Sequence, residues 1–189
     1  MAAKQISCLL IGEGALLVQC GDALIARGHR VHGVVSASSA VQKWAKDNDL
    51  RLLQRGADTD RQLETEQFDW LFSIANLRML PESIWSRATH GAANFHDGPL
   101  PLFAGLNAPA WGIMAGATRY GVVWHQITKG ADEGDILASA DVDISDEDTS
   151  LSLNTKCFAA GIATFGQLLD DIENDSVASV AQDLSKRTY

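Results

Sequence analysis

The sequence predicts an α/β fold, a Rossmann-like, mostly parallel central sheet flanked by helices. Short and almost wholly apolar runs, such as "ISCLLIG" at 6–12 and "DWLFSIA" at 69–75, are typical of strands buried on both faces. Helical stretches separate these runs at short spacing, as right-handed crossovers between parallel strands require. The length of 189 residues fits one domain.

The first half of the chain alternates strands and helices. Gly12 and Gly14 mark a tight turn after the first strand, and Gly28 ends the helix that follows. Either Ser38 or Ser39 is expected to cap the next helix. The expected strands are 6–12, 31–36, 51–54 and 69–75, and the expected helices are 15–27, 40–48, 58–67 and a short one that Pro81 begins.

The second half begins with a strand that ends at His96. Pro99 and Pro101 then prevent regular structure, because proline lacks a backbone donor. Thr149 is expected to cap a long final helix with apolar residues at helical spacing. The expected elements are the strand 90–96, a helix over 107–115, strands over 119–128 and 135–144, the helix 150–173 and an irregular polar tail of fifteen residues.

The composition excludes several classes of function. The net charge of −9 disfavours nucleic-acid binding, which depends on Lys and Arg at the phosphates. Three separated cysteines have no metal-binding spacing, so we expect buried thiols in a reducing compartment and no metal site. No cleavable leader and no apolar run of about 18 residues is found, so we expect a cytoplasmic protein without a membrane partner.

The stretch "NFH" places two polar side chains at a strand end. Asn94 and His96 are two residues apart, so in a strand they point to the same side. The proline-stiffened segment 97–105 follows directly. This arrangement is typical of an active site.

A second candidate lies in "TKGADEGDIL" at 128–137, a loop between two expected strands. Gly130 and Gly134 flank Asp132, so backbone amides there can approach a ligand closely. A solvated acidic loop is the alternative. His125 precedes the loop and, taken alone, is more typical of a structural strand histidine.

Asn94, His96 and Asp132 together suggest acyl transfer from a carbonyl donor to an amine. An asparagine amide can stabilise an oxyanion, a histidine can donate a proton near neutral pH, and an aspartate can orient the histidine or accept a proton. Neither motif contains a nucleophilic Ser or Cys, so we expect direct attack on the donor carbonyl.

A nucleotide-binding Rossmann domain is a weaker alternative. "GEG" at 12–14 follows a strand and precedes a helix, as a phosphate-binding turn would. The third glycine of the dinucleotide motif is replaced by Leu17, and Ser36 stands where an acidic residue would close the second strand. A tight turn without a nucleotide is therefore favoured.

These residues resemble the 10-formyltetrahydrofolate-dependent formyltransferase family, which includes the catalytic domain of methionyl-tRNA formyltransferase. The family pattern is Asn-x-His, a Leu-Leu-Pro loop followed by glycine, and G-x-D-x-G-x-I. The matching segments are "NFH" at 94–96, "PLPLFAG" at 99–105 and "GADEGDI" at 130–136. "ANLRMLPESIW" at 75–85 is similar to the family's folate-binding segment. The resemblance covers essentially the whole chain and implies the formyltransferase fold.

The resemblance also implies roles. Asn94 and His96 would polarise the formyl oxygen, and Asp132 would set the protonation of the histidine and help to remove the proton of the amine. The co-substrate would be 10-formyltetrahydrofolate. The residues implied in binding it are Asn76, Leu77, Arg78, Met79, Leu80, Gly130, Ala131 and Gly134.

Two departures from the family pattern concern the acceptor. Asp97 follows the histidine where Gly, Pro or Asn is usual, and "LFAG" lacks a basic residue often found there. The stretch 95–116 looks most like formyltransferase domains of nonribosomal peptide and polyketide synthases. The implied acceptor is the amino group of an aminoacyl group tethered to a carrier protein, and 1–189 would be one catalytic domain of a larger multidomain protein.

Other acceptors and a non-catalytic role stay open. A free amino acid or an amino sugar would use the same chemistry. An initiator tRNA is disfavoured, because the region after the second strand has no basic cluster. A catalytically inactive formyltransferase-like binding module is the alternative from another class, and the intact Asn94, His96 and Asp132 argue against it.

Overall fold

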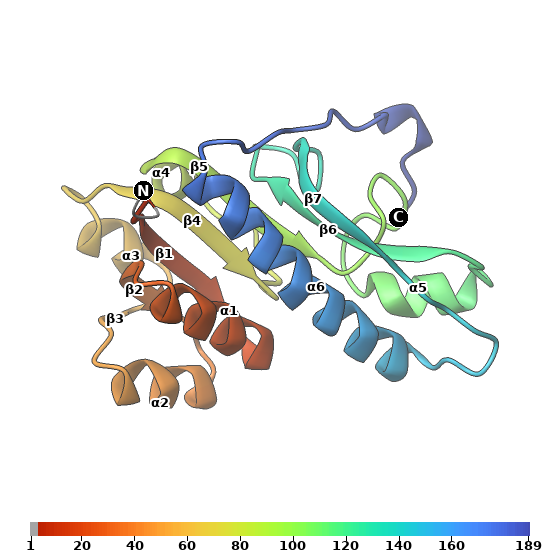
Figure 1. The fold of residues 1–189 in the computed structure, drawn as a ribbon, viewed down its shortest axis with the longest axis horizontal. Helices are drawn as coiled ribbons and strands as arrows, with labels where there is room; N and C mark the ends of the chain where they lie inside the picture. The colour runs from red at the N-terminus through yellow and green to blue at the C-terminus, as the bar shows by residue number, and fades with distance from the viewer. Residues whose placement is uncertain (1–3) are drawn as a thin grey trace. The chain divides into compact units, whose positions relative to one another are not determined.

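The computed structural model describes residues 4–189, which form two compact units that divide between Asn94 and Phe95 (Figure 1). Each unit is described by itself below. That the whole of 1–189 acts as one catalytic domain stays a prediction.

The first unit contains a parallel sheet. Its strands have the order β3-β2-β1-β4-β5, and all four pairs of neighbouring strands are parallel. The strands are β1 (Ser7–Gly12), β2 (Arg30–Val35), β3 (Leu52–Leu53), β4 (Phe68–Ile74) and β5 (Ala88–His96), the last of which runs into the second unit. The helices are α1 (Gly14–Ala26), α2 (Ser39–Asp47), α3 (Ala57–Gln62) and α4 (Glu82–Trp85).

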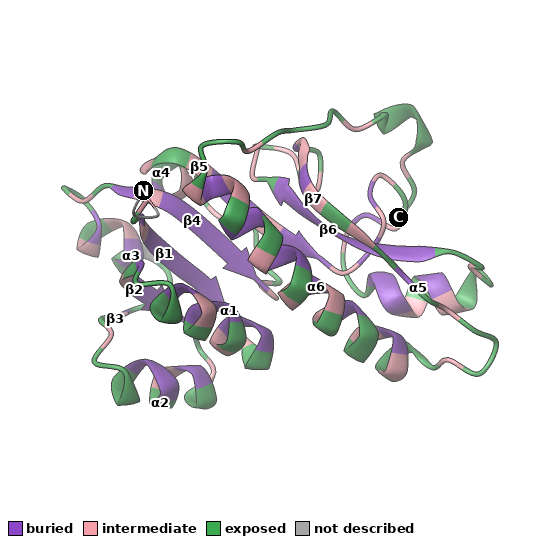
Figure 2. Ribbon diagram, viewed as in Figure 1, coloured by how far each residue is buried: buried purple, intermediate pink, exposed green. Residues whose placement is uncertain are grey.

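The centre of this sheet is buried on both faces, as the apolar runs predict. Figure 2 shows β1 and β4 buried along nearly their whole length. The end of β1 approaches β4 so closely that a Cβ on Gly12 would lie 1.7 Å from the carbonyl oxygen of Ile74. Gly12 also has a φ of 148°, so a side chain is excluded there for two reasons.

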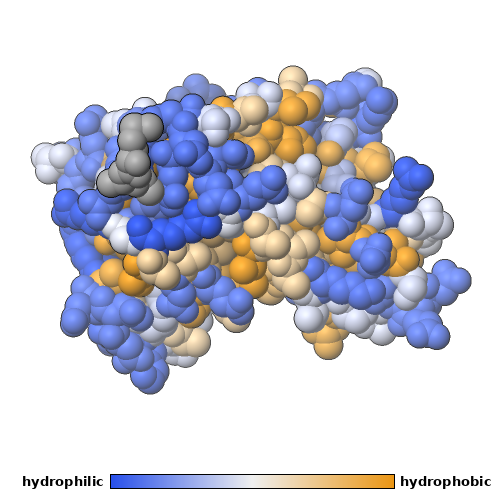
Figure 3. All heavy atoms as spheres, in the orientation of Figure 1, coloured by the Kyte–Doolittle hydropathy of each residue, from blue (hydrophilic) through white to orange (hydrophobic). Residues whose placement is uncertain are grey.

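The helices of the first unit follow the predicted positions with one correction. Ser38 is the residue that caps α2, since its side chain accepts a hydrogen bond from the amide of Val41. Val41, Trp44 and Ala45 form the buried side of α2, whose outer surface is mainly hydrophilic (Figure 3).

The helix predicted over 58–67 is wrong in length, because α3 ends at Gln62. Arg51 donates to the carbonyl of Gln62, and Arg87 donates to the carbonyls of Leu63 and Glu64. Side chains from other parts of the chain therefore satisfy carbonyls at the end of α3 and just beyond it, where intrahelical donors are missing.

The second unit contains an antiparallel pair of strands and two helices. β6 (Tyr120–Gln126) pairs with β7 (Ile136–Val142), with His125 opposite Ile136. α5 (Ala108–Met114) precedes the pair, and α6 (Ser150–Glu173) packs against both strands. Thr149 caps α6 as predicted, in a reciprocal pair with Ser152.

The tail after α6 is largely irregular, as expected, with one short turn of 3-10 helix, η1 (Leu184–Lys186). It nevertheless follows a defined course within its unit (Figure 1). Val180 forms an antiparallel bridge with Ile136, and Thr188 exchanges backbone hydrogen bonds with the segment 101–104.

The fold class is confirmed: the chain is α/β, and its sheet is mostly parallel with helices beside it. The three cysteines are free and buried, as predicted. Within residues 4–189, none of the helices combines the length and the apolar character that crossing a bilayer demands.

Candidate active site

Asp132 lies in the loop that joins β6 to β7, within the second unit. Its φ of 54° is in the left-handed region, which few non-glycine residues adopt without local support. The loop closes tightly, because a Cβ on Gly134 would lie 1.9 Å from the carbonyl oxygen of Gln126. The glycine therefore allows the loop to turn back against the end of β6.

His96 ends β5 and is buried. Its Nε2 donates to the carbonyl of Phe103 at 2.8 Å, and its Nδ1 lies 3.8 Å from Oδ2 of Asp132. The amide of Gly105 donates to the same carboxylate oxygen at 2.8 Å. The proline-containing segment therefore anchors both the imidazole and the carboxylate.

His125 is a second histidine at this carboxylate, and the interpretation of it as a merely structural strand histidine is corrected here. Its Nε2 lies 3.4 Å from Oδ1 of Asp132, and its Nδ1 donates to the carbonyl of Gln126 at 2.9 Å. His125 is buried at the end of β6. The only sequence signal was its position at a strand end seven residues before Asp132.

The surroundings of Asp132 stabilise its charged form. Burial by itself raises the pKa of this carboxyl, but the hydrogen bond from His125, the charge of His96 and the Gly105 amide lower the pKa to about 2. The carboxylate is therefore ionised at neutral pH. The carbonyls of Phe103 and Gln126 can only accept, so each imidazole keeps a proton on the nitrogen that faces its carbonyl. The other nitrogen of each ring faces Asp132.

Asp97, one of the two departures from the family pattern, is half-buried directly after His96. Burial raises the pKa of its carboxyl above the usual range, and the nearby Asp132 acts in the same direction. Its Oδ2 accepts a hydrogen bond from Asn154 of α6 at 3.1 Å. Asp97 is thus tied to the helix rather than left in solvent.

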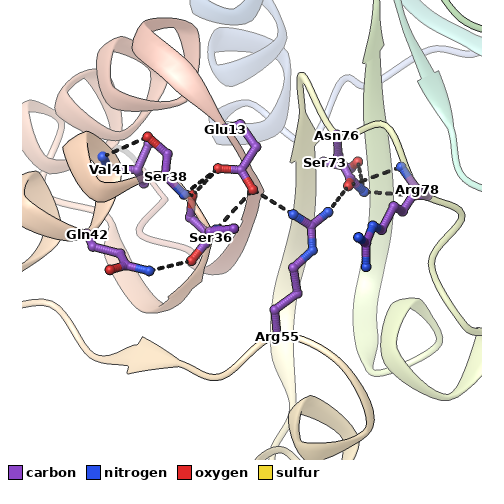
Figure 4. A network of polar contacts seen from close by, with 10 residues as sticks. Glu13, Ser36, Ser38, Val41, Gln42, Arg55, Ser73, Asn76 and Arg78 are labelled. Atoms are coloured by element: carbon purple, nitrogen blue, oxygen red, sulfur yellow. Dashed lines mark hydrogen bonds and ion pairs between the residues drawn. The ribbon is translucent and has the colours of Figure 1, made fainter.

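The predicted folate-binding segment 76–80 lies in the first unit, directly after β4 (Figure 4). The Asn76 side chain accepts from Arg55 at 2.9 Å and donates to the carbonyl of Arg78 at 2.9 Å. Leu77 and Met79 are 71% and 59% exposed. The segment therefore contains an internal hydrogen bond from Asn76 to Arg78, and its apolar side chains are exposed to solvent.

The "GEG" turn is held by its own glutamate (Figure 4). Glu13 accepts hydrogen bonds from the Ser36 hydroxyl at 2.6 Å and from the amides of Ala37 and Ser38 at 2.9 and 2.7 Å, and it pairs with Arg55 at 2.6 Å. A carboxylate at this turn repels phosphate. The geometry favours the tight turn without a nucleotide.

The structure thus brings His96, Asp132 and the additional His125 together. Asn94 is the last residue of the first unit, two positions before His96 on β5. Its part in the site stays a prediction, as do the roles of the folate-binding residues. The remaining predicted residues, Gly130, Ala131 and Gly134, lie in the Asp132 loop. Within residues 4–189, no group of three or more His, Cys, Asp or Glu side chains is placed to hold a metal ion.

Known proteins resemble the chain over nearly all its length. The formyl transferase family matches residues 5–167. A methionyl-tRNA formyltransferase from Alkaliphilus oremlandii (strain OhILAs) is 24% identical over 96% of this chain, which spans 64% of that enzyme.

Two solved structures share the fold. WlaRD, a sugar 3N-formyltransferase solved in the presence of dTDP and 5-N-formyl-THF, aligns with a TM-score of 0.81 at 19% identity, covering 98% of this chain and 69% of that one. Phosphoribosylglycinamide formyltransferase from Anaplasma phagocytophilum aligns with a TM-score of 0.81 at 23% identity, covering 91% and 89%. With the family match over most of its residues, this chain belongs to the formyl transferase family.

Proposed function

We propose that this chain transfers the formyl group of 10-formyltetrahydrofolate to an amine. The observation that carries the proposal is the partly buried, ionised Asp132 carboxylate, which two carbonyl-anchored histidines face. Family membership supports the reaction class. The structural neighbour WlaRD was solved with a formylated tetrahydrofolate, which supports the co-substrate.

The proposed reaction needs no covalent enzyme intermediate. The amine nitrogen attacks the formyl carbon and forms a C–N bond, and the bond from the formyl carbon to the folate nitrogen breaks. The acceptor amine loses one proton, and the departing folate nitrogen gains one. In the proposed reaction, the Asn94 amide donates a hydrogen bond to the oxyanion of the tetrahedral intermediate, and His96 polarises the same oxygen through Nδ1, the nitrogen that is not bound to Phe103. Asp132 receives the amine proton directly or through water.

The co-substrate is bound in part by the segment 76–80. Asn76, held by Arg55, keeps the backbone of this segment in one conformation. Its exposed apolar side chains suit the flat face of a pterin ring. The Asp132 loop contributes Gly130, Ala131 and Gly134.

We propose a carrier-tethered aminoacyl group as the acceptor, ahead of free amino acids and amino sugars. The support is the resemblance of 95–116 to synthase-associated domains and the absence of Lys and Arg between Arg87 and Arg119. A phosphate-rich acceptor is normally held by cations. Leu102 and Leu106 are exposed in this segment and suit an uncharged arm.

The test is a formyl-transfer assay with 10-formyltetrahydrofolate and a panel of amines: an aminoacyl carrier protein, free amino acids, a nucleotide-linked amino sugar and methionyl-tRNA. The proposal predicts N-formyl product and free tetrahydrofolate in equal amounts, detected by mass spectrometry. Asp132→Asn should lower kcat by about 100- to 10,000-fold because it removes the proton acceptor. Asp141→Asn, an exposed change on β7, is the matched control.

Three outcomes decide between the alternatives. Product with the carrier substrate alone supports the proposed acceptor, whereas product with another amine replaces it. Full activity of Asp132→Asn removes the proposed role of this carboxylate. Reduced-folate binding without transfer to any amine identifies a binding module.

A further inference from the structure

We propose that the tail segment 180–188 is a positioning element for the candidate active site, with Gln182, Arg187 and Thr188 as its positioning residues. The expected effect of this segment on the reaction rate rests on the proposed function. Its structural basis lies wholly within the second unit, where one short segment contacts both loops that support the histidine–aspartate cluster.

The first set of contacts holds the Asp132 loop. The Gln182 side-chain amide donates to the carbonyl of Asp132 at 3.0 Å and to the carbonyl of Gly134 at 2.6 Å. Arg187 donates to the carbonyl of Ala131 at 2.6 Å and pairs with the Glu133 carboxylate at 2.5 Å. Three of the four consecutive carbonyls in 131–134 therefore accept hydrogen bonds from the tail.

The second set of contacts holds the loop that anchors His96. The Thr188 hydroxyl accepts from the amide of Phe103 at 2.8 Å, and the Thr188 carbonyl accepts from the amide of Ala104 at 2.8 Å. The Thr188 amide donates to the carbonyl of Pro101 at 3.2 Å. The carbonyl of Phe103 is the acceptor for Nε2 of His96, so Thr188 fixes the residue to which the imidazole is anchored.

Each of the two loops contains a non-glycine residue in a left-handed backbone conformation, which needs support from its surroundings. Asp132 and Phe103 are non-glycine residues with φ values of 54° and 55°, and such conformations persist only where the surrounding structure enforces them. Each of these two residues makes the contact that matters for the chemistry. Asp132 carries the carboxylate, and Phe103 supplies the carbonyl that fixes the His96 tautomer.

The contacts of the tail differ from those of a segment that only covers the protein surface. The tail is mostly exposed, and Arg187 and Gln182 are its partly buried polar residues in contact with the Asp132 loop. Their donors point to backbone carbonyls, which set the course of the chain, rather than to exposed side chains alone. The carboxyl group that these bonds position lies at the candidate site, so the expected effect of losing them is on the rate of transfer.

The experiment compares Gln182→Leu, Arg187→Met and Thr188→Val, which keep side-chain size and remove the donor or acceptor. Lys186→Met is the matched control, because Lys186 is exposed and pairs with Asp183 of the same turn. Hydrogen exchange of peptides covering 99–105 and 128–136 is measured first, since it needs no substrate. The three variants should raise exchange there and leave β1 and β4 unchanged, while the control changes neither.

The kinetic arm uses the full chain and the acceptor found in the assay above. Gln182→Leu should lower kcat by about 10- to 100-fold with KM for the folate nearly unchanged, as expected for misplaced catalytic groups. In an Asp132→Asn background the same change should cost nothing further, because its effect passes through that carboxylate. Arg187→Met should lower kcat as well, and Arg187→Lys, which retains one donor, should keep part of the rate that Arg187→Met loses.

Each result supports or overturns the proposal. Unchanged exchange in both loops overturns it, as does a Gln182→Leu loss that is equally large in the Asp132→Asn background. The same loss in Lys186→Met also overturns it, because the effect is then one of general stability. A wild-type chain that transfers no formyl group overturns the proposed function instead, and the exchange measurement still decides whether the tail holds the loops.

Discussion

The Nε2 atom of His125 lies 3.4 Å from Oδ1 of Asp132, which is closer than the 3.8 Å between Nδ1 of His96 and Oδ2 of the same carboxylate. The carboxylate thus has one imidazole on each oxygen. The histidine that resembles no family motif is the nearer of the two. This geometry makes His125 a candidate positioning residue for Asp132.

His125→Gln should lower kcat by about 10- to 100-fold, because partners that orient a functional group typically contribute that much. It should also shift the acidic limb of the pH–rate profile to higher pH, since the hydrogen bond from His125 helps to hold the pKa of Asp132 low. His90→Asn, a change of an exposed histidine on β5, is the control. If the pH–rate profile of His125→Gln were the same as that of the wild type, His125 would contribute only to packing.

Asp132 also makes stability depend on pH. Its pKa is lowered to about 2 in the folded protein, below the unfolded value of about 3.9. The carboxylate therefore contributes stability above pH about 4, and this contribution is lost as the pH falls through about 2. Urea unfolding of wild type and Asp132→Asn should show the wild type more stable at pH 7, with a difference that shrinks below pH about 4. If the difference in the free energy of unfolding did not change with pH, the conclusion that Asp132 is ionised in the folded protein would be contradicted.

Arg55 links the "GEG" turn to the predicted folate-binding segment, pairing with Glu13 at 2.6 Å and donating to Asn76 at 2.9 Å. Arg55→Met should weaken binding of 5-formyltetrahydrofolate by about 10-fold or more, because a hydrogen bond to a charged group is lost and Asn76 is released. Isothermal titration calorimetry measures this directly. Arg61→Met removes a more exposed arginine, which pairs with Asp58, and should leave affinity unchanged. Equal affinities of all three proteins would remove Arg55 from folate binding.

Asp97→Asn should stabilise the protein at neutral pH. Burial raises the pKa of Asp97 above its unfolded value, so ionisation costs the folded state free energy once the pH exceeds that value. Asparagine removes the charge and still offers an oxygen to Asn154. Thermal unfolding should show a higher midpoint for the variant than for the wild type at pH 7, and a smaller increase at pH 4. A lower midpoint at pH 7 would show that the charge is stabilising.

Patterns among residues close together in the sequence were sufficient to predict much of the fold. The apolar run of β1 and the cap of α6 at Thr149 follow from hydrophobicity and hydrogen bonding among residues close along the chain. The end of α3 did not follow from local pattern; there, Arg51 and Arg87, which lie outside the helix, donate to the carbonyls of Gln62 and Leu63. Helix propensity contains no information about such distant donors.

The same distinction applies to the candidate site. The sequence by itself determined the α/β class, the strand end at His96 and the loop that carries Asp132, since period and turn chemistry act between near neighbours. Only the tertiary structure decided that His125 and His96 face one carboxylate and that Gln182, fifty residues beyond Asp132, donates to its backbone. Hydrogen bonds select partners by distance and direction in space, and sequence separation does not enter that choice.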